Sequence, residues 1–468
     1  MHRNSLFSLF ISIAILSTAI FTGCAKEASI SEQEAVIIPP NPPNRKASSK
    51  TPELFIYTRN KITSNYTEAY FYFFDSKKHY SYFSPTENFD DYGYIKKRGN
   101  STAQSQKKPF NIKFEQKKDF FGMGKAKKWV LLSNPYDPAL IRNKLIYDLA
   151  SNLSFVFSPK SYFFDVWLNG TFMGNYQIVQ KIGFQKNRIP YDVDNGDFLF
   201  ELVESEIRNN INDNYFFTPI DSFRITLTEP DTPSHEQKKD FSKKLKRIEK
   251  AIGSKDIKQY IQHVDLRSII DYYWIEEFVN NPDLHTGSIF FTIHDGILRG
   301  GPVWDFDLAL GNTRTSQKAA TKGLNAQKIW WAKLFQDSVF QKIAYERYLQ
   351  IEPYFDNLAN DNELGKNKID SVVNYFRNSF DHNFSDSGWA YCDSLETDNP
   401  QEKRTLDCPF NPTPLPTFDE NIQFLRNWIT ERNLYIKETV SSRLKKLSHL
   451  ELDLEQVLTL QDSIFESK

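Results

Sequence analysis

Runs of β-branched and aromatic residues alternate with polar turns through the first half of the chain. The runs at 54–58 (LFIYT), 69–74 (AYFYFF) and 107–114 (KKPFNIKF) have the length and composition of β-strands. Three more strand-like runs follow, at 161–170, 171–182 and 196–204. The dipeptide Asn169-Gly170 between the first two of these predicts a hairpin. This half of the chain is therefore expected to be mostly sheet.

One helix is expected within this sheet-rich half. Over 137–153, leucine and isoleucine residues recur at helical spacing. Asp137 is the candidate N-cap and Pro138 the first helical residue, which suits proline because its missing N–H would have no partner there.

The second half of the chain is predicted to be mainly helical. The expected helices cover 235–253, 265–281, 328–350, 365–380 and 417–447. Between them, the segment 288–307 contains two strand-like runs around Asp295-Gly296, which predicts another hairpin. We therefore predict an α+β fold, with a sheet-rich lobe (53–205), a mainly helical lobe (206–450), a cleft between them and a C-terminal tail (451–468).

The N-terminus has the pattern of an export signal. Arg3 precedes an uncharged, largely apolar run that ends at Gly23, and the letters FTGC resemble a bacterial lipobox ending at Cys24. Residues 1–23 are thus predicted to be a lipoprotein signal peptide, with 24–52 as a lipidated cysteine and flexible tether. The alternative is a transmembrane anchor. Either interpretation predicts an exported protein; the first anchors it to the cell envelope, in the periplasm or on the outer surface.

Cysteine content and charge narrow the class of protein further. After Cys24, only Cys392 and Cys408 remain, and in an oxidising compartment such a pair is expected to form a disulfide. Two free thiols are the alternative. The formal net charge of -1 gives no indication of a nucleic-acid partner.

Two carboxylates interrupt an apolar stretch at 301–312, GPVWDFDLALGN. Carboxylates rarely lie in such a run unless a cation or a partner group compensates Asp305 and Asp307. The helix at 265–281 must end before Pro282, which leaves Asp283 on a loop. A hairpin returns the chain to its starting level, so Asp283 and Asp305 are expected to lie close together at its open end. Protein kinases pair a catalytic-loop aspartate with a magnesium-binding aspartate in this way.

Several further motifs occur in an order that resembles the spore coat protein H (CotH) kinase family. They are RGNST (98–102), KKPFNIKF (107–114), WVLLSNPYDPALIRNKLIYDLA (129–150), LNGTFMGNYQIVQKI (168–182), NNPD (280–283) and GGPVWDFDLALGN (300–312). The resemblance implies an atypical two-lobed protein-kinase-like fold. It also implies ATP and Mg²⁺ as cofactors, and transfer of the ATP γ-phosphate to serine or threonine of a protein substrate.

The resemblance implies a role for individual residues. Asp283 corresponds to the catalytic general base, and Asp305 to the Mg²⁺ ligand. Asp307 is either a second ligand or a cap of the segment that follows it. The candidates for binding the cofactor are Lys108, Lys113, Lys181 and Arg142. Of the two lysines in KKPFNIKF, Lys108 is preferred, but the sequence does not separate it from Lys113.

Two departures from kinase patterns keep other functions open. Ser288 stands where ordinary kinases place a metal-binding asparagine, and Gln180 stands where relatives often have glutamate. A non-catalytic, pseudokinase-like surface module that binds a partner or a glycan is therefore the first alternative. The second is a glycoside hydrolase, which needs two carboxylates about 5–10 Å apart around a sugar.

Overall fold

The computed structural model of the protein describes residues 51–75, 89–99, 102–203, 215–284, 287–313, 320–385 and 415–467. All of them belong to one compact unit, Pro40–Lys468. The predicted signal peptide, Cys24, most of the tether, Cys392 and Cys408 lie outside the described residues.

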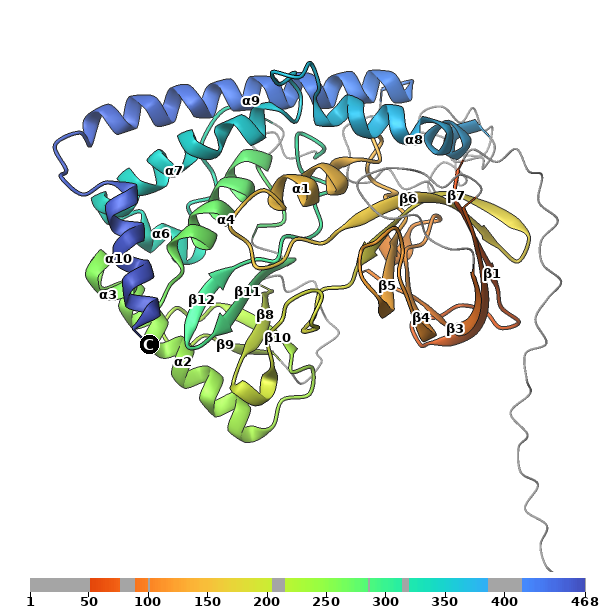
Figure 1. The fold of residues 1–468 in the computed structure, drawn as a ribbon, viewed down its shortest axis with the longest axis horizontal. Helices are drawn as coiled ribbons and strands as arrows, with labels where there is room; N and C mark the ends of the chain where they lie inside the picture. The colour runs from red at the N-terminus through yellow and green to blue at the C-terminus, as the bar shows by residue number, and fades with distance from the viewer. Residues whose placement is uncertain are drawn as a thin grey trace, which may run out of the picture. The chain divides into compact units, whose positions relative to one another are not determined.

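Seven strands of the first half form a closed barrel (Figure 1). The strands are β1 (Glu53–Tyr57), β2 (Thr67–Phe74), β3 (Phe89–Lys97), β4 (Phe110–Lys118), β5 (Ala126–Leu132), β6 (Ser161–Leu168) and β7 (Thr171–Gln180). Their order around the barrel is β1-β2-β3-β4-β5-β7-β6, and β1 closes it by pairing in parallel with β6. The strands alternate as a half-buried sheet requires, because Phe110, Ile112 and Phe114 of β4 are buried while Asn111 and Lys113 between them are partly exposed.

The predicted α+β class is confirmed, with strands concentrated in the first half and helices in the second. Closure of the barrel was not predicted. Period-two alternation identifies strands but not their partners, and the closing pair joins Glu53 to Asp165 across more than a hundred residues. The two-lobed kinase-like arrangement stays a prediction, since the structure shows a closed barrel where an N-terminal lobe was expected.

A second, five-stranded sheet has the order β12-β11-β8-β10-β9. Its strands are β8 (Phe198–Leu202), β9 (Tyr215–Phe217), β10 (Arg224–Glu229), β11 (Ile289–His294) and β12 (Ile297–Gly300). The predicted hairpin at Asp295-Gly296 is present as β11 and β12. Strand β8, which the sequence placed in the first lobe, pairs with β10 and β11 of this sheet instead of with the barrel.

The described helices agree broadly with the predicted ones. They are α1 (Arg142–Ala150), α2 (His235–Gly253), α3 (Ile257–Tyr260), α4 (Leu266–Val279), α6 (Ile329–Leu334), α7 (Ser338–Asp356), α8 (Lys368–Ser385), α9 (Phe418–Lys446) and α10 (Leu454–Glu466). The single helix expected over 328–350 is two helices, because the side chain of Asp337 caps the start of α7. The segment treated as a C-terminal tail contains α10, which contacts α7.

Helix α1 begins at Arg142, so the predicted start at Asp137 is wrong. Leu140 has a φ of 61°, in the left-handed region, which prevents a continuous helix from Pro138 onward. Asp137 still serves the helix start, because its carboxylate accepts hydrogen bonds from the backbone N–H groups of Ala139 and Arg142, at 3.0 and 2.8 Å.

Helix α4 is the central helix of the second half, and every residue in it except Arg267 is buried. It contacts α7 and α9, which also pack against each other (Figure 1). Helix α8 lies against β6 and β7 of the barrel. Within the described part of the chain, no helix has both the length and the apolar character needed to cross a bilayer. The loop that follows α4 leads to the predicted catalytic aspartate.

Candidate active site

The loop after α4 holds Asp283 in a fixed backbone position. Asn280 ends the helix in the left-handed conformation, with φ 49° and ψ 52°. Asn281 donates a 2.8 Å hydrogen bond from Nδ2 to Oε2 of Glu276, and its Oδ1 accepts the backbone N–H of Asp283 at 2.9 Å. The buried end of α4 thus fixes the position of the candidate general base.

Asp305 lies at the open end of the β11–β12 hairpin, where the two chain segments meet. The hydroxyl of Ser288, just before β11, donates to Oδ2 of Asp305 at 3.3 Å. The backbone N–H of Ser288 donates to Oε1 of Glu201 on β8 at 2.7 Å. Ser288 and Asp305 both have positive φ values, 63° and 67°. Such backbone conformations are uncommon for these residue types and recur at functional sites.

Asp307 is buried among other carboxylates. Burial raises the pKa of Asp307 well above its usual value, and the negative charges of Asp305, Asp283 and Asp137 raise it further. Asp283 and Asp305 both act on Asp307, so we group the three carboxylates as the acidic cluster. The described residues that follow Asp307 form turns rather than a helix, and the N–H of Leu308 donates to its carboxylate, so capping of this segment and metal binding both stay predictions.

The acidic cluster has the ligand chemistry of a magnesium site. Three carboxylates and the Ser288 hydroxyl supply only oxygen atoms, which are the ligands that Mg²⁺ takes in proteins. A divalent cation would also relieve the like-charge repulsion that raises the pKa of Asp307. The oxygen chemistry of these residues suits Mg²⁺, and binding of the ion at this cluster stays a prediction.

Helix α1 supports the backbone of the acidic segment. Oδ1 of Asn143 accepts the N–H of Phe306 at 2.7 Å, and Nε of Arg142 donates to the carbonyl of Ala309 at 3.1 Å. Arg142 is buried and also pairs with Asp137. Direct binding of a nucleotide by Arg142 stays a prediction, and these contacts give it a supporting role.

The loop after β3 reaches the acidic cluster from the barrel. The guanidinium of Arg98 lies 5.6 Å from the ring centre of Trp304, which stacks on Tyr147 at 5.8 Å. Burial raises the pKa of the Tyr147 hydroxyl, and the negative charge of Asp305 raises it further. Arg98 belongs to the RGNST motif, so this motif and the WDFD motif, far apart in sequence, meet in the structure.

The two adjacent lysines at the start of KKPFNIKF make different contacts. Nζ of Lys108 donates to the carbonyl of Ser105 at 2.6 Å, within its own loop. Nζ of Lys107 is buried and donates to the Asn175 carbonyl and to Oδ1 of Asn383, at 2.7 and 2.6 Å. The preference for Lys108 as the phosphate ligand therefore gains no support from these contacts.

Lys113 and Lys181, the other candidate lysines, belong to a row of cations on the barrel. Lys113 on β4 faces Lys128 on β5 across the ladder, and Lys181 directly follows β7, the next strand. Burial lowers the pKa of Lys181, and the positive charges of Lys128, Lys96 and Arg188 lower it further. We call Lys96, Lys113, Lys128, Lys181 and Arg188 the basic row. Such a concentration of positive charge suits a phosphate-bearing ligand.

The basic row leads toward the acidic cluster along β3. Lys96 and Arg98 are two residues apart, and the N–H of Arg98 still pairs with the Pro109 carbonyl, so both side chains face the same side. Sequence reasoning missed Lys96, Lys128 and Glu201, because only strand pairing brings them to the site. Of these three, Glu201 alone had a signal in the sequence, because it is a glutamate inside the apolar strand at 198–202.

Comparison with known families decides which class of protein carries this geometry. The family described as CotH kinase protein matches residues 95–436, which include the basic row and the acidic cluster. The chain belongs to the CotH kinase family. A comparison with curated proteins found no match. Membership in this family supports a kinase-type enzyme in general, and kinases use ATP with a divalent metal ion.

Proposed function

We propose that this CotH family member transfers the γ-phosphate of ATP to serine or threonine side chains of a protein. The observation that carries the proposal is the acidic cluster at the open end of the β11–β12 hairpin, where Asp307 is buried beside Asp283 and Asp305. Family membership supports phosphoryl transfer as the chemistry of this cluster.

Asp283 is assigned the role of general base. In the transfer, the bond between the γ-phosphorus and its bridging oxygen breaks, a bond to the substrate hydroxyl oxygen forms, and ADP leaves. Asp283 accepts the hydroxyl proton, and its fixed loop after α4 limits the positions from which the hydroxyl can attack.

Asp305 and Asp307 are assigned to hold Mg²⁺, with the Ser288 hydroxyl beside Asp305. Mg²⁺, when bound, neutralises negative charge on the transferred phosphate. The positive φ of Asp305 and the contacts from Asn143 and Arg142 aim this short segment into the cluster.

The basic row is assigned to the nucleotide phosphates. Lys113 and Lys181, both predicted from sequence, belong to it, while the amine of Lys108 binds its own loop. Arg98 stands between the row and the acidic cluster, so we expect it to contact the transferred phosphate.

We also propose that the protein is exported and anchored to the cell envelope by a lipid on Cys24, which holds the kinase domain near a membrane. Incorporation of labelled palmitate into the full-length chain, and its loss in Cys24→Ala, tests this. Label in neither protein would contradict it.

The departure at Ser288 favours one alternative, a module that binds nucleotide without transferring phosphate. The hydroxyl of Ser288 already donates to Asp305, and its N–H is bound to Glu201. A serine hydroxyl is a weaker metal ligand than a carboxylate oxygen, so the metal would rely on Asp305 and Asp307.

Labelled ATP separates these functions. Full-length protein is incubated with Mg²⁺ and γ-labelled ATP, and label is sought on the protein and on a basic-protein substrate, followed by identification of the phosphorylated amino acid. Asp283→Asn is expected to lower the rate roughly 10²–10⁴-fold, the usual range for a general base. Asp305→Asn should abolish Mg²⁺-dependent transfer. Glu363→Gln, at an exposed loop position, is the matched control.

Each other outcome of this experiment is informative. Nucleotide binding without transfer supports the non-catalytic module. Transfer that persists in both aspartate variants would contradict the assigned roles, and absence of both binding and transfer would contradict a kinase.

A further inference from the structure

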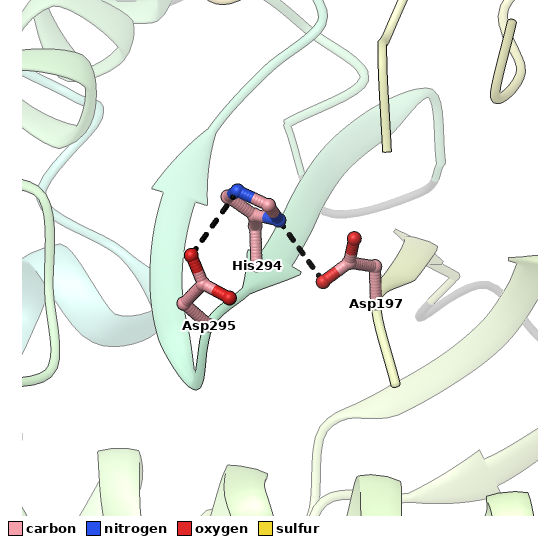
Figure 2. A group of neighbouring side chains, drawn as sticks. All are labelled: Asp197, His294 and Asp295. Carbon is pink, nitrogen blue, oxygen red and sulfur yellow. Dashed lines mark ion pairs between the residues drawn. The ribbon is translucent and has the colours of Figure 1, made fainter. Parts of the chain in front are cut away.

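A second group of ionisable side chains lies at the opposite, closed end of the β11–β12 hairpin. His294 is the last residue of β11, and Asp295 is in the turn. Strand β8 pairs with β11 so that Phe198 faces Ile293, which places Asp197, just before β8, beside His294. Figure 2 shows the two carboxylates at opposite nitrogens of the imidazole ring.

The ring of His294 and the carboxylate of Asp197 are both held in place. Tyr191 stacks on the imidazole at 3.9 Å with an interplanar angle of 8°. Arg299 donates a 3.0 Å hydrogen bond to the His294 carbonyl, and Oδ2 of Asp197 accepts the N–H of Asp192 at 3.1 Å. The remaining oxygen of Asp197 therefore meets the imidazole at a defined place.

The inner contact of this group is a close approach without a hydrogen bond. Nδ1 of His294 lies 3.0 Å from Oδ1 of Asp197, whose side chain is 1% exposed. Neither atom has a hydrogen-bond partner among the described residues. On the outer side, Nε2 lies 3.3 Å from Oδ2 of Asp295, which is 73% exposed. Figure 2 marks both contacts as ion pairs, which hold when both ring nitrogens are protonated; if only Nε2, facing Asp295, is protonated, Nδ1 presents a lone pair to the Asp197 oxygen.

Two lone-pair atoms at this separation match neighbouring ligands of one metal ion. Zinc binds imidazole nitrogen and carboxylate oxygen at about 2.0–2.2 Å, so two ligand atoms 3.0 Å apart subtend an angle of roughly 90° at the ion. A carboxylate is one of the common partners of the other ring nitrogen of a metal-bound histidine, because it fixes the tautomer and the ring orientation. Asp295 has this position.

We propose that Asp197 and His294 bind a divalent transition-metal ion of the zinc class through Oδ1 and Nδ1, with Asp295 orienting the imidazole and water completing the coordination. The nitrogen ligand distinguishes this site from the all-oxygen acidic cluster, which suits Mg²⁺. Among the described residues, the nearby cation Arg299 pairs with Asp265 at 3.5 Å.

The ion would tie the hairpin turn to the start of β8. The turn lies one strand length from the acidic cluster, roughly 20 Å for six residues of β11. The metal would therefore stabilise the β11–β12 hairpin, which lies between Ser288 and Asp305 in the chain. It would take no part in phosphate transfer. Its expected effect is a rise in melting temperature that depends on metal concentration.

Metal titration of the full-length protein tests the site. Protein is stripped with EDTA, dialysed, supplied with excess Mg²⁺ to occupy the acidic cluster, and titrated with Co²⁺ or Zn²⁺. We expect one bound ion per chain, Co²⁺ absorption bands typical of a nitrogen ligand, and a raised melting temperature. His294→Gln and Asp197→Asn should each weaken binding at least tenfold. His235→Gln, at an exposed histidine of α2, and Asp305→Asn should leave it unchanged.

A measurement on the unaltered protein covers the case in which a variant fails to fold. Diethylpyrocarbonate modifies accessible imidazoles, and mass spectrometry locates the modified residues. Zn²⁺ should protect His294 while His235 remains reactive. Absence of Co²⁺ and Zn²⁺ binding, binding undiminished in His294→Gln, or equal modification of His294 with and without Zn²⁺ would each overturn the proposal.

Discussion

Two buried carboxylates in this protein, Glu277 and Asp307, have opposite surroundings. Glu277 on α4 is paired with Arg432 of α9 at 2.7 Å, and both side chains are 0% exposed. Its oxygens also accept the backbone N–H groups of Asn325 and Ala326, at 2.9 and 2.8 Å. The negative charge of Glu277 is thus compensated within the chain.

Asp307 is buried beside groups of its own sign. Burial raises the pKa of Asp307, the negative charges of Asp305, Asp283 and Asp137 raise it further, and the N–H of Leu308 opposes them. A compensated buried charge stabilises a fold only when its partners are all present. A buried group of like charges instead calls for a cation from outside. The partners of a buried carboxylate, rather than its burial, therefore distinguish a structural role from a functional one.

The largest stability effect is expected at the compensated pair. Arg432→Met removes the cation from Glu277 and the donors from the carbonyls of Phe278, Thr321 and Gly323. Breaking a buried pair on one side costs about 3–5 kcal/mol, because the remaining charge is left buried alone. Denaturant unfolding of the variant and the unaltered protein measures the difference.

Arg267→Met is the matched control for this prediction. Arg267 also pairs with an aspartate, Asp462, but its side chain is 35% exposed. An exposed pair contributes at most about 1 kcal/mol. If Arg432→Met and Arg267→Met lowered the free energy of unfolding by the same amount, burial and the number of partners would not explain a difference between the two ion pairs.

Lys107 provides an intermediate case, a buried cation whose amine contacts neutral acceptors. Burial lowers the pKa of Lys107 to about 7, and the charge of Asp165 only partly opposes this. Above pH 7 the folded chain releases this proton, while the unfolded chain holds it up to the usual lysine pKa of 10.5. The unfolded state then binds more protons, so stability rises with pH through this window.

Comparison with Lys107→Met isolates this contribution. The unfolding free energy of the unaltered protein minus that of the variant should increase by about 2 kcal/mol between pH 7 and pH 9. Lys239→Met, at an exposed position of α2, should show no such change. A constant difference across this range for Lys107→Met would mean that the buried amine keeps its proton.

How far the sequence predicts this molecule depends on whether the signal is local. Alternation and helical spacing located most strands and helices, and α2 begins at His235 as predicted, with Ser234 as its N-cap. The closure of β1 onto β6 depends on the twist and length of all seven strands, which no local pattern encodes.

The same limit applies to the candidate site. Asp283 and Asp305 were located because one short hairpin connects them, so their proximity follows from chain geometry. Lys96 and Lys128 lie on different strands of the barrel, and only the register of β3, β4 and β5 brings them near Lys181. In the sequence each appears as an ordinary surface lysine.

The smallest effect is expected at Asp307, and its sign is the informative part. The raised pKa means that the folded chain holds a proton that the unfolded chain releases above its usual carboxyl pKa of 3.8. Stability therefore falls as pH rises above that value when metal is absent. In EDTA at pH 8, Asp307→Asn should therefore be more stable than the unaltered protein, as denaturant unfolding would measure. This advantage should vanish below pH 3.8.

Addition of Mg²⁺ should reverse the order of the two proteins. The unaltered chain gains the binding free energy of the ion, and Asp307→Asn gains less because one ligand is lost. Glu363→Gln should follow the unaltered protein under both conditions. A variant that is less stable in EDTA at pH 8 would make Asp307 a structural acceptor like Glu277, and the difference between the two carboxylates would no longer hold.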